Sequence, residues 1–228
     1  FSNNATTAQG GSIYNTTGGN ATVEGSSFSG NTSAGVGGAI YNDIDAELSV
    51  SGSTFTDNEA GDGGAIQSSR ANAQVTNSTF TNNSATYWGG AINVSGGTAT
   101  VAGSTFANNS AQYGGGIANT GALTVSNSTF AENSADNGGG IFIQAGSAQV
   151  VNVTLSEHSA AISGGALYVV GGLMTLQNTI AAQSTSGGNC AVDDGTLAAD
   201  SHNLADDATC AGATVSSSIN LGSLANNG

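Results

Sequence analysis

Few residues of this 228-residue chain have the chemistry of a catalytic or ligand-binding site, and most of those that do are acids. The segment YNDIDAE at residues 41–47 places Asp43, Asp45 and Glu47 at alternate positions, on one face of an extended strand. A second acidic group follows at Asp57, Glu59 and Asp62. Such carboxylates could hold Ca²⁺ or flank the scissile bond of a neutral glycan, but we prefer to interpret them as a solvated turn insertion. A calcium-binding GGxGxD nonapeptide is absent from the sequence, and we expect no metal and no other cofactor.

Two cysteines and a histidine near the C-terminal end are further candidates for reactive chemistry. Cys190 and Cys210 could form a disulfide, remain as free buried thiols or hold a metal, but no His lies at ligand spacing from either, which argues against zinc. A bond between them would close a loop of about 20 residues and stabilise the chain by about 3 kcal/mol. Asp200, Ser201 and His202 are neighbours only in sequence, whereas a catalytic triad needs residues that converge in space beside an oxyanion hole.

The charge composition excludes several function classes. The chain has 15 acidic residues and one basic side chain, Arg70, which gives a formal net charge of −14 at pH 7. Nucleic acid is not an expected partner, because phosphate binding requires clustered Lys and Arg. The same field would repel anionic membranes and polyanionic sugars. Enzymes that act on acidic sugars also need basic residues in their sites, so we predict that the chain is not an enzyme.

The composition also bears on where the protein acts. No apolar run approaches the roughly 20 residues that a bilayer-spanning helix needs, so membrane insertion is not expected. The chain lacks Lys, is rich in Ser, Thr, Asn and Gly, and has two Cys, a composition typical of secreted bacterial or archaeal surface proteins. It begins at Phe1 without an initiator Met or a signal peptide, which indicates a processed chain. We therefore predict an extracellular or cell-surface location.

The elements that must position these residues follow a repeat of about 25 residues. Large apolar residues mark it at Phe1, Phe28, Phe55, Phe80, Phe106, Phe130, Leu155 and Ile180. Two more apolar positions keep step with it, at Ile13, Ile40, Ile66, Ile92, Ile117, Ile141 and Leu167, and at Val23, Val50, Val75, Val101, Val125 and Val150. The segments around them alternate and are rich in Val, Thr and Phe, which favours strands over helical repeats. We predict an all-β fold, a right-handed single-stranded parallel β-helix with about 25 residues and three short strands per coil.

Glycine marks the bends of the predicted coils. The phrase GGAI at residues 37–40 returns in related forms along most of the chain. We expect the Gly pair at each bend because Gly accepts a positive φ without penalty, and we expect the following Ile or Leu to enter the core. At a second bend Gly and Asn exchange, which is typical of a left-handed residue, at Gly25, Gly52, Asn77, Gly103, Asn127 and Asn152.

A column of amides is predicted beside the aromatic column. Three residues after each aromatic the chain places Asn31, Asn58, Asn83, Asn109 and Asn133, and His158 and Gln183 are expected to continue the column. If these side chains face inward, they can bond to the coils above and below as a structural ladder. The alternative interpretation is a row of amides that binds sugars. We prefer the structural ladder.

The paired phrases GGAI and FxxN resemble the repeats of chlamydial polymorphic outer-membrane proteins and of the wider bacterial and archaeal surface proteins that share them. The likeness covers roughly residues 1–185. It implies a β-helix, and proteins with such repeats serve as adhesin passengers, stalks and spacers.

The C-terminal part carries a second resemblance. Residues 178–212, followed by INLGSLANNG at 219–228, look like the closing coils of bacterial surface β-helix proteins that usually end in a cell-anchoring segment. In that family the two cysteines are thought to pair, which here implies a bond between Cys190 and Cys210. This chain departs from the family in lacking prolines near LGSL and in stopping after NNG. We expect coils over residues 1–185 and atypical closing coils over residues 186–228, within one continuous domain.

Together these observations predict a structural function. We expect a secreted protein whose subunits stack end to end, through Phe1 at one end and Leu224 at the other, into an extracellular filament or surface stalk. Its partner would then be further copies of itself. An adhesin passenger that binds cell-surface glycans is the alternative, and a carbohydrate-active enzyme is the third interpretation.

Overall fold

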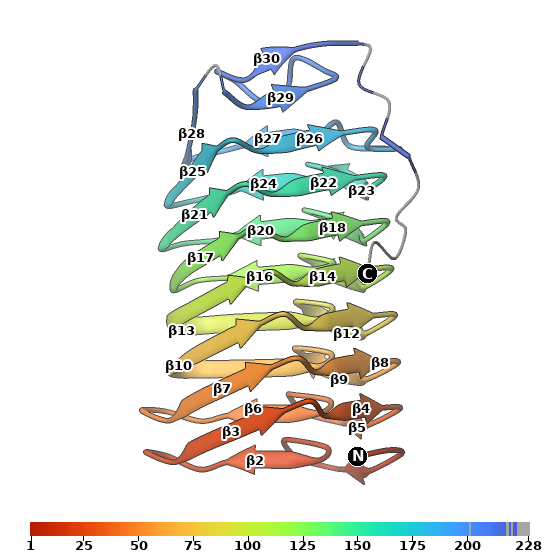
Figure 1. The fold of residues 1–228 in the computed structure, drawn as a ribbon, viewed down its shortest axis with the longest axis vertical. Coiled ribbons are helices and arrows are strands. Elements are labelled where there is room, and N and C mark those ends of the chain that lie inside the picture. The colour runs from red at the N-terminus through yellow and green to blue at the C-terminus, as the bar shows by residue number, and fades with distance from the viewer. Residues whose placement is uncertain (201, 218, 220, 223–228) are drawn as a thin grey trace.

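The computed structural model of the chain describes residues 1–200, 202–217, 219 and 221–222. Figure 1 shows a rod of stacked coils, with the N-terminus in the coil at one end and each coil lying on the one before it. Every strand pair among the described residues is parallel, as expected when each coil adds one layer to the same sheets. About eight coils with a repeat of roughly 25 residues form a β-solenoid, which confirms the predicted all-β class.

The phenylalanine columns form the first of three sheets, here called the phenylalanine sheet. Its nine strands alternate outward Ser or Thr with an inward aromatic or aliphatic residue in most coils. In chain order they are β4 (Ser27–Ser29), β8 (Thr54–Thr56), β11 (Thr79–Thr81), β14 (Thr105–Ala107), β18 (Thr129–Ala131), β22 (Thr154–Ser156), β26 (Ile180–Ala182), β29 (Leu204–Ala205) and β30 (Thr214–Val215).

The isoleucine and valine columns share the second sheet, here called the two-armed sheet. Its isoleucine arm contains β2 (Ile13–Asn15), β6 (Ile40–Asn42), β16 (Ile117–Asn119), β20 (Ile141–Ile143), β24 (Leu167–Val169) and β27 (Cys190–Val192). Its valine arm contains β3 (Asn20–Glu24), β7 (Glu47–Ser51), β17 (Ala122–Ser126), β21 (Ser147–Val151), β25 (Leu173–Gln177) and β28 (Thr196–Ala199). In two coils the arms join in one unbroken strand, β10 (Ile66–Thr76) and β13 (Ile92–Ala102).

The third sheet, here called the short sheet, follows the asparagine column and has no aliphatic anchor in the sequence pattern. Its inward residues are small, as with Ser33, Ala60, Ala85 and Ala160, all of which are buried. The strands are β1 (Ala5–Thr6), β5 (Thr32–Ser33), β9 (Glu59–Asp62), β12 (Ser84–Trp88), β15 (Ser110–Tyr113), β19 (Ser134–Asn137) and β23 (Ser159–Ser163). The predicted three strands per coil therefore correspond to one strand in each of three sheets.

The core is one column of apolar side chains that runs the length of the rod. Phe28, Phe55, Phe80, Phe106 and Phe130 are completely buried, and the rings of successive coils stack with centroids 4.5 to 4.8 Å apart. The isoleucine and valine columns pack against them in the same cluster. Identical residues meet at each level, because the register pairs each anchor with its equivalent one coil away.

One anchor assigned from the sequence is wrong by one residue. Leu155 pairs with Ala181 in the phenylalanine sheet, whereas Ile180 pairs with Thr154 and is only partly buried. Ala181 is 2% exposed and lies in the core, so it is the eighth member of the column. The larger side chain, Ile180, lies one residue before the inward-facing position, and strand register, not side-chain size, decides which residue faces inward.

Different structural constraints require glycine at the two positions of each GG corner. Gly89 has φ 64°, as the sequence predicts, but Gly90 is not among the residues with positive φ. A Cβ on Gly90 would instead overlap the carbonyl oxygen of Gly115, in the next coil. Positive φ explains only the first glycine, and close approach of neighbouring backbones explains the second. At the other bend the left-handed assignment is confirmed, with φ between 49° and 59° at all six predicted positions, Gly25, Gly52, Asn77, Gly103, Asn127 and Asn152.

Candidate functional site

The asparagine column forms a continuous hydrogen-bonded ladder inside the rod. Asn31, Asn58, Asn83, Asn109 and Asn133 have no exposed surface. The side chain of Asn83 shows the pattern, since its Nδ2 donates to Asn109 Oδ1 (3.0 Å) and to the Phe55 carbonyl (3.0 Å) in the coil below. Its Oδ1 accepts two bonds from the coil below as well, so both donors and both acceptor positions of the amide are used. These side chains are therefore not available to a sugar.

The ladder changes chemistry towards the C-terminal coils. His158 takes the next position, where its Nδ1 accepts the backbone N–H of Asn133 (3.0 Å) and its Nε2 has no partner. Complete burial lowers the pKa of His158 to about 4, so the ring is neutral. The predicted next member, Gln183, is wrong. Gln183 has φ 60° and lies at the bend, whereas Ser184 follows Ala181 by three residues and occupies the ladder position.

A second polar ladder was not predicted. Buried serines immediately before the phenylalanine strands accept the backbone N–H of the equivalent serine one coil below, as in Ser53 N–H to Ser78 Oγ (3.1 Å). Each hydroxyl donates in turn to the carbonyl two residues earlier, as in Ser78 Oγ to Thr76 O (2.8 Å). The members are Ser53, Ser78, Ser104 and Ser128, all at most 4% exposed. The recurring Ser in the phrases NSTF and GSTF was the signal for this ladder.

The predicted acidic strand face is wrong. Asp43 and Asp45 lie in the turn between β6 and β7, and Asp45 has φ 58°, so their side chains do not share a strand face with Glu47. The Asp43 carboxylate is occupied by hydroxyl groups, accepting from Thr17 (2.8 Å), Tyr14 (2.9 Å) and Tyr41 (3.1 Å). The backbone N–H of Ile44 also donates to it and, with these hydroxyls, holds its pKa below the usual value.

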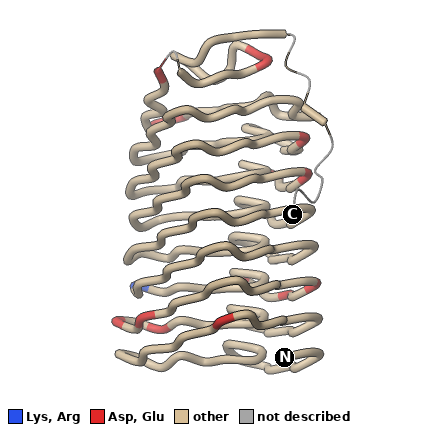
Figure 2. The backbone as a smooth tube through the Cα atoms, viewed as in Figure 1, with Lys and Arg blue, Asp and Glu red and all other residues tan. Residues whose placement is uncertain are grey.

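The other acidic residues are also dispersed. Figure 2 shows most of the Asp and Glu positions at the bends along the edges of the rod. Among the described residues no three His, Cys, Asp or Glu side chains gather in a way that could hold a metal ion, which contradicts the calcium candidate at Asp43, Asp45 and Glu47. Asp200 and His202 form an exposed pair 3.2 Å apart, and such surface pairs contribute little to stability. Ser201 lies outside the described residues.

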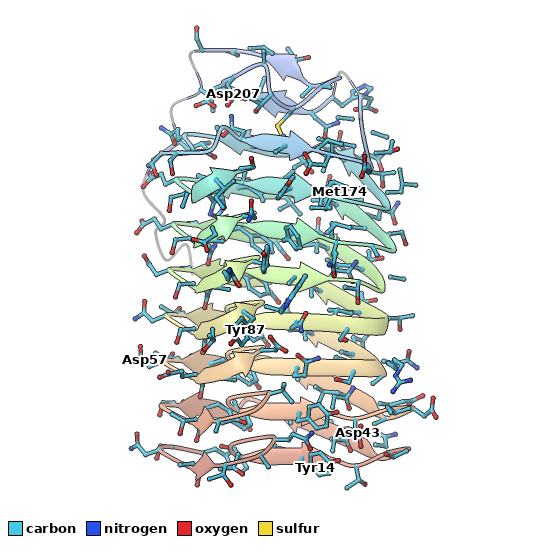
Figure 3. The ribbon with its side chains drawn as sticks, turned by 180° about the vertical axis from the view of Figure 1, so that it is seen from behind. Tyr14, Asp43, Asp57, Tyr87, Met174 and Asp207 are labelled. Atoms are coloured by element: carbon cyan, nitrogen blue, oxygen red, sulfur yellow. A yellow bond between two sulfur atoms is a disulfide. The ribbon has the colours of Figure 1, made fainter. Side chains whose placement is uncertain are left out.

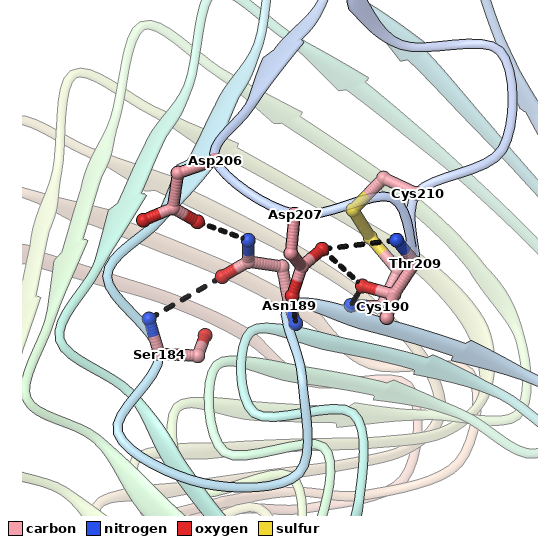
Figure 4. The surroundings of a disulfide bond; sticks show 7 residues. All are labelled: Ser184, Asn189, Cys190, Asp206, Asp207, Thr209 and Cys210. Atoms are coloured by element: carbon pink, nitrogen blue, oxygen red, sulfur yellow. Dashed lines mark hydrogen bonds between the residues drawn. A yellow bond between two sulfur atoms is a disulfide. The ribbon is translucent and has the colours of Figure 1, made fainter. Parts of the chain in front are cut away.

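The predicted disulfide between Cys190 and Cys210 is confirmed. Cys190 takes the place of an isoleucine-column residue, paired with Leu167, and Cys210 comes from the loop after β29 (Figure 4). Both cysteines are buried. The bond therefore fastens the last loop to the core column.

Asn189 supports the same region where the asparagine ladder has ended. It is fully buried, and its Oδ1 accepts the backbone N–H of Ser184 (3.3 Å) while its Nδ2 donates to Asp206 (2.6 Å). Its own backbone N–H donates to Asp207 (2.9 Å). Burial raises the pKa of Asp207, but bonds from Thr209 and Asn189 outweigh it and hold the pKa below the usual value. The polar contacts and the disulfide together order the closing coils.

The predicted assembly residue Phe1 lies at the end of the aromatic column. Its ring stacks on Phe28 with centroids 4.8 Å apart and an interplanar angle of 3°, and it remains 61% exposed. Asn4 stands beside it as the lowest step of the ladder, donating to Asn31 Oδ1 (2.9 Å). Phe1 and Asn4 therefore make the same aromatic stack and amide bond with the second coil as their equivalents make within the rod. Leu224, the other predicted assembly residue, lies outside the described residues.

A small aromatic cluster packs outside the coils, against the isoleucine arm. Trp88 stacks on Tyr113 with centroids 4.8 Å apart, and Phe142 meets Trp88 edge to face at 5.5 Å. Tyr168 packs against Phe142, and its hydroxyl donates to Asp193, which raises the pKa of Tyr168 to about 12. Ala118 lies fully buried beneath these rings. The rings of the cluster pack against one another, so most of their aromatic surface is not available to a ligand.

Tyr87 differs from these rings because it is 54% exposed. It belongs to β12 of the short sheet and lies near mid-height of the rod, away from Tyr14 and Asp43 at the lower end (Figure 3). Shallow hollows lined by both polar and apolar groups lie above and below it. No helix in the described part of the chain is long and apolar enough to cross a membrane.

Comparison with known proteins gives one match. A family model described as a right-handed β-helix region matches residues 1–130 and, in a second overlapping match, residues 37–184. The match covers well over half of the chain, and it agrees with the predicted right hand of the coil. No curated protein and no solved structure matches the chain significantly.

Proposed function

The chain belongs to the right-handed β-helix family, and from this premise we propose that it is a secreted, non-catalytic structural protein whose rods stack end to end into an extracellular filament or surface stalk. The fold and the disulfide are consistent with a surface or secreted protein of structural or adhesin-like type. We also propose that the chain is related to the surface proteins with GGAI and FxxN repeats. This relationship is supported by the recurrence of both phrases once in each coil over most of the rod.

The observation that carries the proposal is the set of contacts that joins successive coils along the rod. Within the rod each coil binds the next through an aromatic stack, an asparagine ladder and parallel strand edges. The first coil uses all three kinds of contact with the second, through Phe1, Asn4 and the strands β1 to β3. In the proposed filament, coils of two different molecules join through the same three kinds of contact. Contacts of this head-to-tail type propagate and do not close.

Electrostatics predicts when such stacking occurs. Each chain carries a formal net charge of −14, so two rods repel each other at low ionic strength. At about 0.15 M salt the Debye length falls to about 8 Å, which screens charges on the side walls but leaves apolar stacking at the end intact. We expect assembly to increase with salt and with protein concentration.

The test compares two aspartate variants by sedimentation velocity and negative-stain microscopy over a range of salt. Phe1→Asp places a charge in the stacking contact and is expected to abolish elongation while leaving the melting temperature of the rod within a few degrees. Ile162→Asp adds the same charge at a side-wall residue that is 68% exposed and is expected to assemble like the parent. A parent that stays monomeric at all salt concentrations, or a Phe1→Asp variant that elongates normally, would contradict the proposal.

A glycan-binding adhesin is the second candidate function. One specific observation favours it, the exposed Tyr87 between two shallow hollows on the side of the rod. The two functions use different surfaces, so they are compatible in one molecule.

A further inference from the structure

The outer face of the short sheet carries two hollows that meet at Tyr87. The upper hollow has a volume of about 440 Å³, and the lower one about 530 Å³. Thr86 and Tyr87 line both of them. The lower hollow extends to Thr6 in the first coil and the upper one to Asp136, so together they run along the rod over six successive coils.

Tyr87 owes its position to an irregularity in the strand. β12 has five residues, whereas β15 and β19 above it and β9 below it have four each. The register shifts between Ser84 and Trp88 on the side of β15 and between Ala85 and Trp88 on the side of β9. An extra residue of this kind bends the strand locally and re-aims a side chain. Trp88 packs into the outer aromatic cluster, which fixes the segment while Tyr87 stays 54% exposed.

The groups around Tyr87 match the chemistry of a sugar. Ala85 and Ala111 line the upper hollow together with Gln112 and Asp136, which supply amide and carboxylate groups. In the lower hollow, Thr32 supplies a hydroxyl group and Glu59 a carboxylate. A pyranose ring has apolar C–H faces that pack on an aromatic ring, and hydroxyl groups on its edges that bond to amides, hydroxyls and carboxylates. The exposed Tyr87 ring and the polar groups beside it offer both kinds of contact.

Charge narrows the class of sugar. Neither hollow is lined by Lys or Arg, and the carboxylates of Glu59 and Asp136 line the two hollows. A uronic acid or sulfated sugar would meet repulsion without a compensating cation, whereas the hydroxyls of an uncharged sugar can donate to these carboxylates.

The spacing of the acids indicates binding without cleavage. The register places Asp136 three coils above Glu59, which is about 14 Å at the spacing of parallel strands. The two carboxylates of a glycoside hydrolase lie about 5 to 9.5 Å apart, so this pair cannot flank one glycosidic bond.

We propose that this face of the short sheet binds an uncharged polysaccharide chain that lies along the rod, with one sugar ring stacked on Tyr87 and its neighbours in the two hollows. A hexose unit and a coil advance by comparable lengths, so a chain of sugars can follow the row of coils. The proposal rests on the glycan-binding function given above as the second candidate, and it does not depend on end-to-end stacking, because the face lies on the side of the rod.

The experiment titrates the purified chain by isothermal calorimetry with five defined hexasaccharides. Cellohexaose, laminarihexaose, mannohexaose and chitohexaose are the uncharged probes, and hexagalacturonic acid is the anionic probe. At least one uncharged probe is expected to bind with a Kd of about 1 mM or lower, and hexagalacturonic acid is expected not to bind.

Three variants test the role of the ring. Tyr87→Ala is expected to weaken binding about tenfold or more, and Tyr87→Phe to retain it, because the aromatic face and not the hydroxyl carries the contact. Tyr14→Ala removes the other largely exposed tyrosine, which is 45% exposed and lies outside both hollows, and is expected to bind like the parent. Thermal melting of each variant verifies that the rod is intact. The proposal is overturned if no uncharged probe binds, if Tyr87→Ala binds as tightly as Tyr14→Ala, or if hexagalacturonic acid binds as well as the uncharged probes.

Discussion

Asn58 and Asn83 lie one above the other inside the rod, and Asn58 gives two hydrogen bonds to a single oxygen of Asn83. Its backbone N–H and its Nδ2 donate to Asn83 Oδ1 at 3.1 and 2.8 Å. The same pair of bonds recurs between Asn31 and Asn58, and between Asn83 and Asn109. Each coil thereby specifies the position of the next one, which explains how a core of repeated residues keeps a unique register.

Replacing Asn83 by Ala is expected to lower the free energy of unfolding by at least about 3 kcal/mol. The change leaves the backbone N–H of Asn58 and one N–H of its Nδ2 buried without an acceptor, and each such group costs about 1 to 3 kcal/mol. The Phe55 carbonyl and Asn109 Oδ1 each lose one hydrogen bond as well. Urea unfolding measures the effect. Asn20→Ala, at an exposed position of β3, is the control and is expected to change stability by less than about 0.5 kcal/mol. Equal losses in the two variants would contradict a structural role for the ladder.

His158 is expected to make the rod sensitive to acid. Burial lowers its folded pKa from 6.5 to about 4, so protons bind the unfolded chain more readily than the folded one. Stability is therefore unaffected by this group above about pH 6.5 and falls as the pH drops from there towards 4, by up to about 3 kcal/mol.

His158→Asn offers the ladder an uncharged amide at this position and removes the titration. Urea unfolding of parent and variant at pH 7.5, 5.0 and 4.0 separates this histidine from the carboxylates, which both proteins share. The parent is expected to lose more stability than the variant on acidification. Parallel pH profiles would show that His158 is not responsible.

The two kinds of glycine are expected to respond differently to substitution. Gly52 has φ 54° with open space around the position of a Cβ, and its equivalent one coil above is Asn77, so Gly52→Asn is expected to cost less than about 0.5 kcal/mol. Gly90→Ala places a methyl group against the Gly115 carbonyl and is expected to cost about 2 kcal/mol or more. Thermal melting compares the two. A Gly90→Ala variant as stable as the parent would contradict the close approach of the two coils.

Reduction of the disulfide is expected to loosen only the closing coils. The bond between Cys190 and Cys210 spans 20 residues, and its loss is expected to cost about 3 kcal/mol. Because coils contact only their neighbours, hydrogen exchange with and without reductant should accelerate over residues 186–212 and remain slow in the coils before Leu155. The Cys190→Ser, Cys210→Ser double variant should reproduce the pattern. Uniform loss of protection would instead indicate that the rod unfolds as one cooperative unit.

The repeated residues were enough to predict the solenoid and most of its core. Phe, Ile and Val that recur about every 25 residues must face one interior, and Gly exchanging with Asn at one bend indicates a left-handed backbone. Both inferences rest on local properties of single residues. They fail where the repeat loses its characteristic residues, as at Ile180 and Gln183, because side-chain type then no longer reports the register and only strand pairing does.

Other features were decided by the tertiary structure alone. The short sheet has inward Ala and Ser that carry no strand signal, and it forms because the coils on either side supply hydrogen-bond partners. Gly90 must be glycine because of a carbonyl 25 residues away in sequence, and Tyr87 faces solvent because one strand has one residue more than its neighbours. These properties depend on the distance and register between coils. A repeat in the sequence predicts that coils stack, but the distance and register between two coils are set only by their packing in the folded rod.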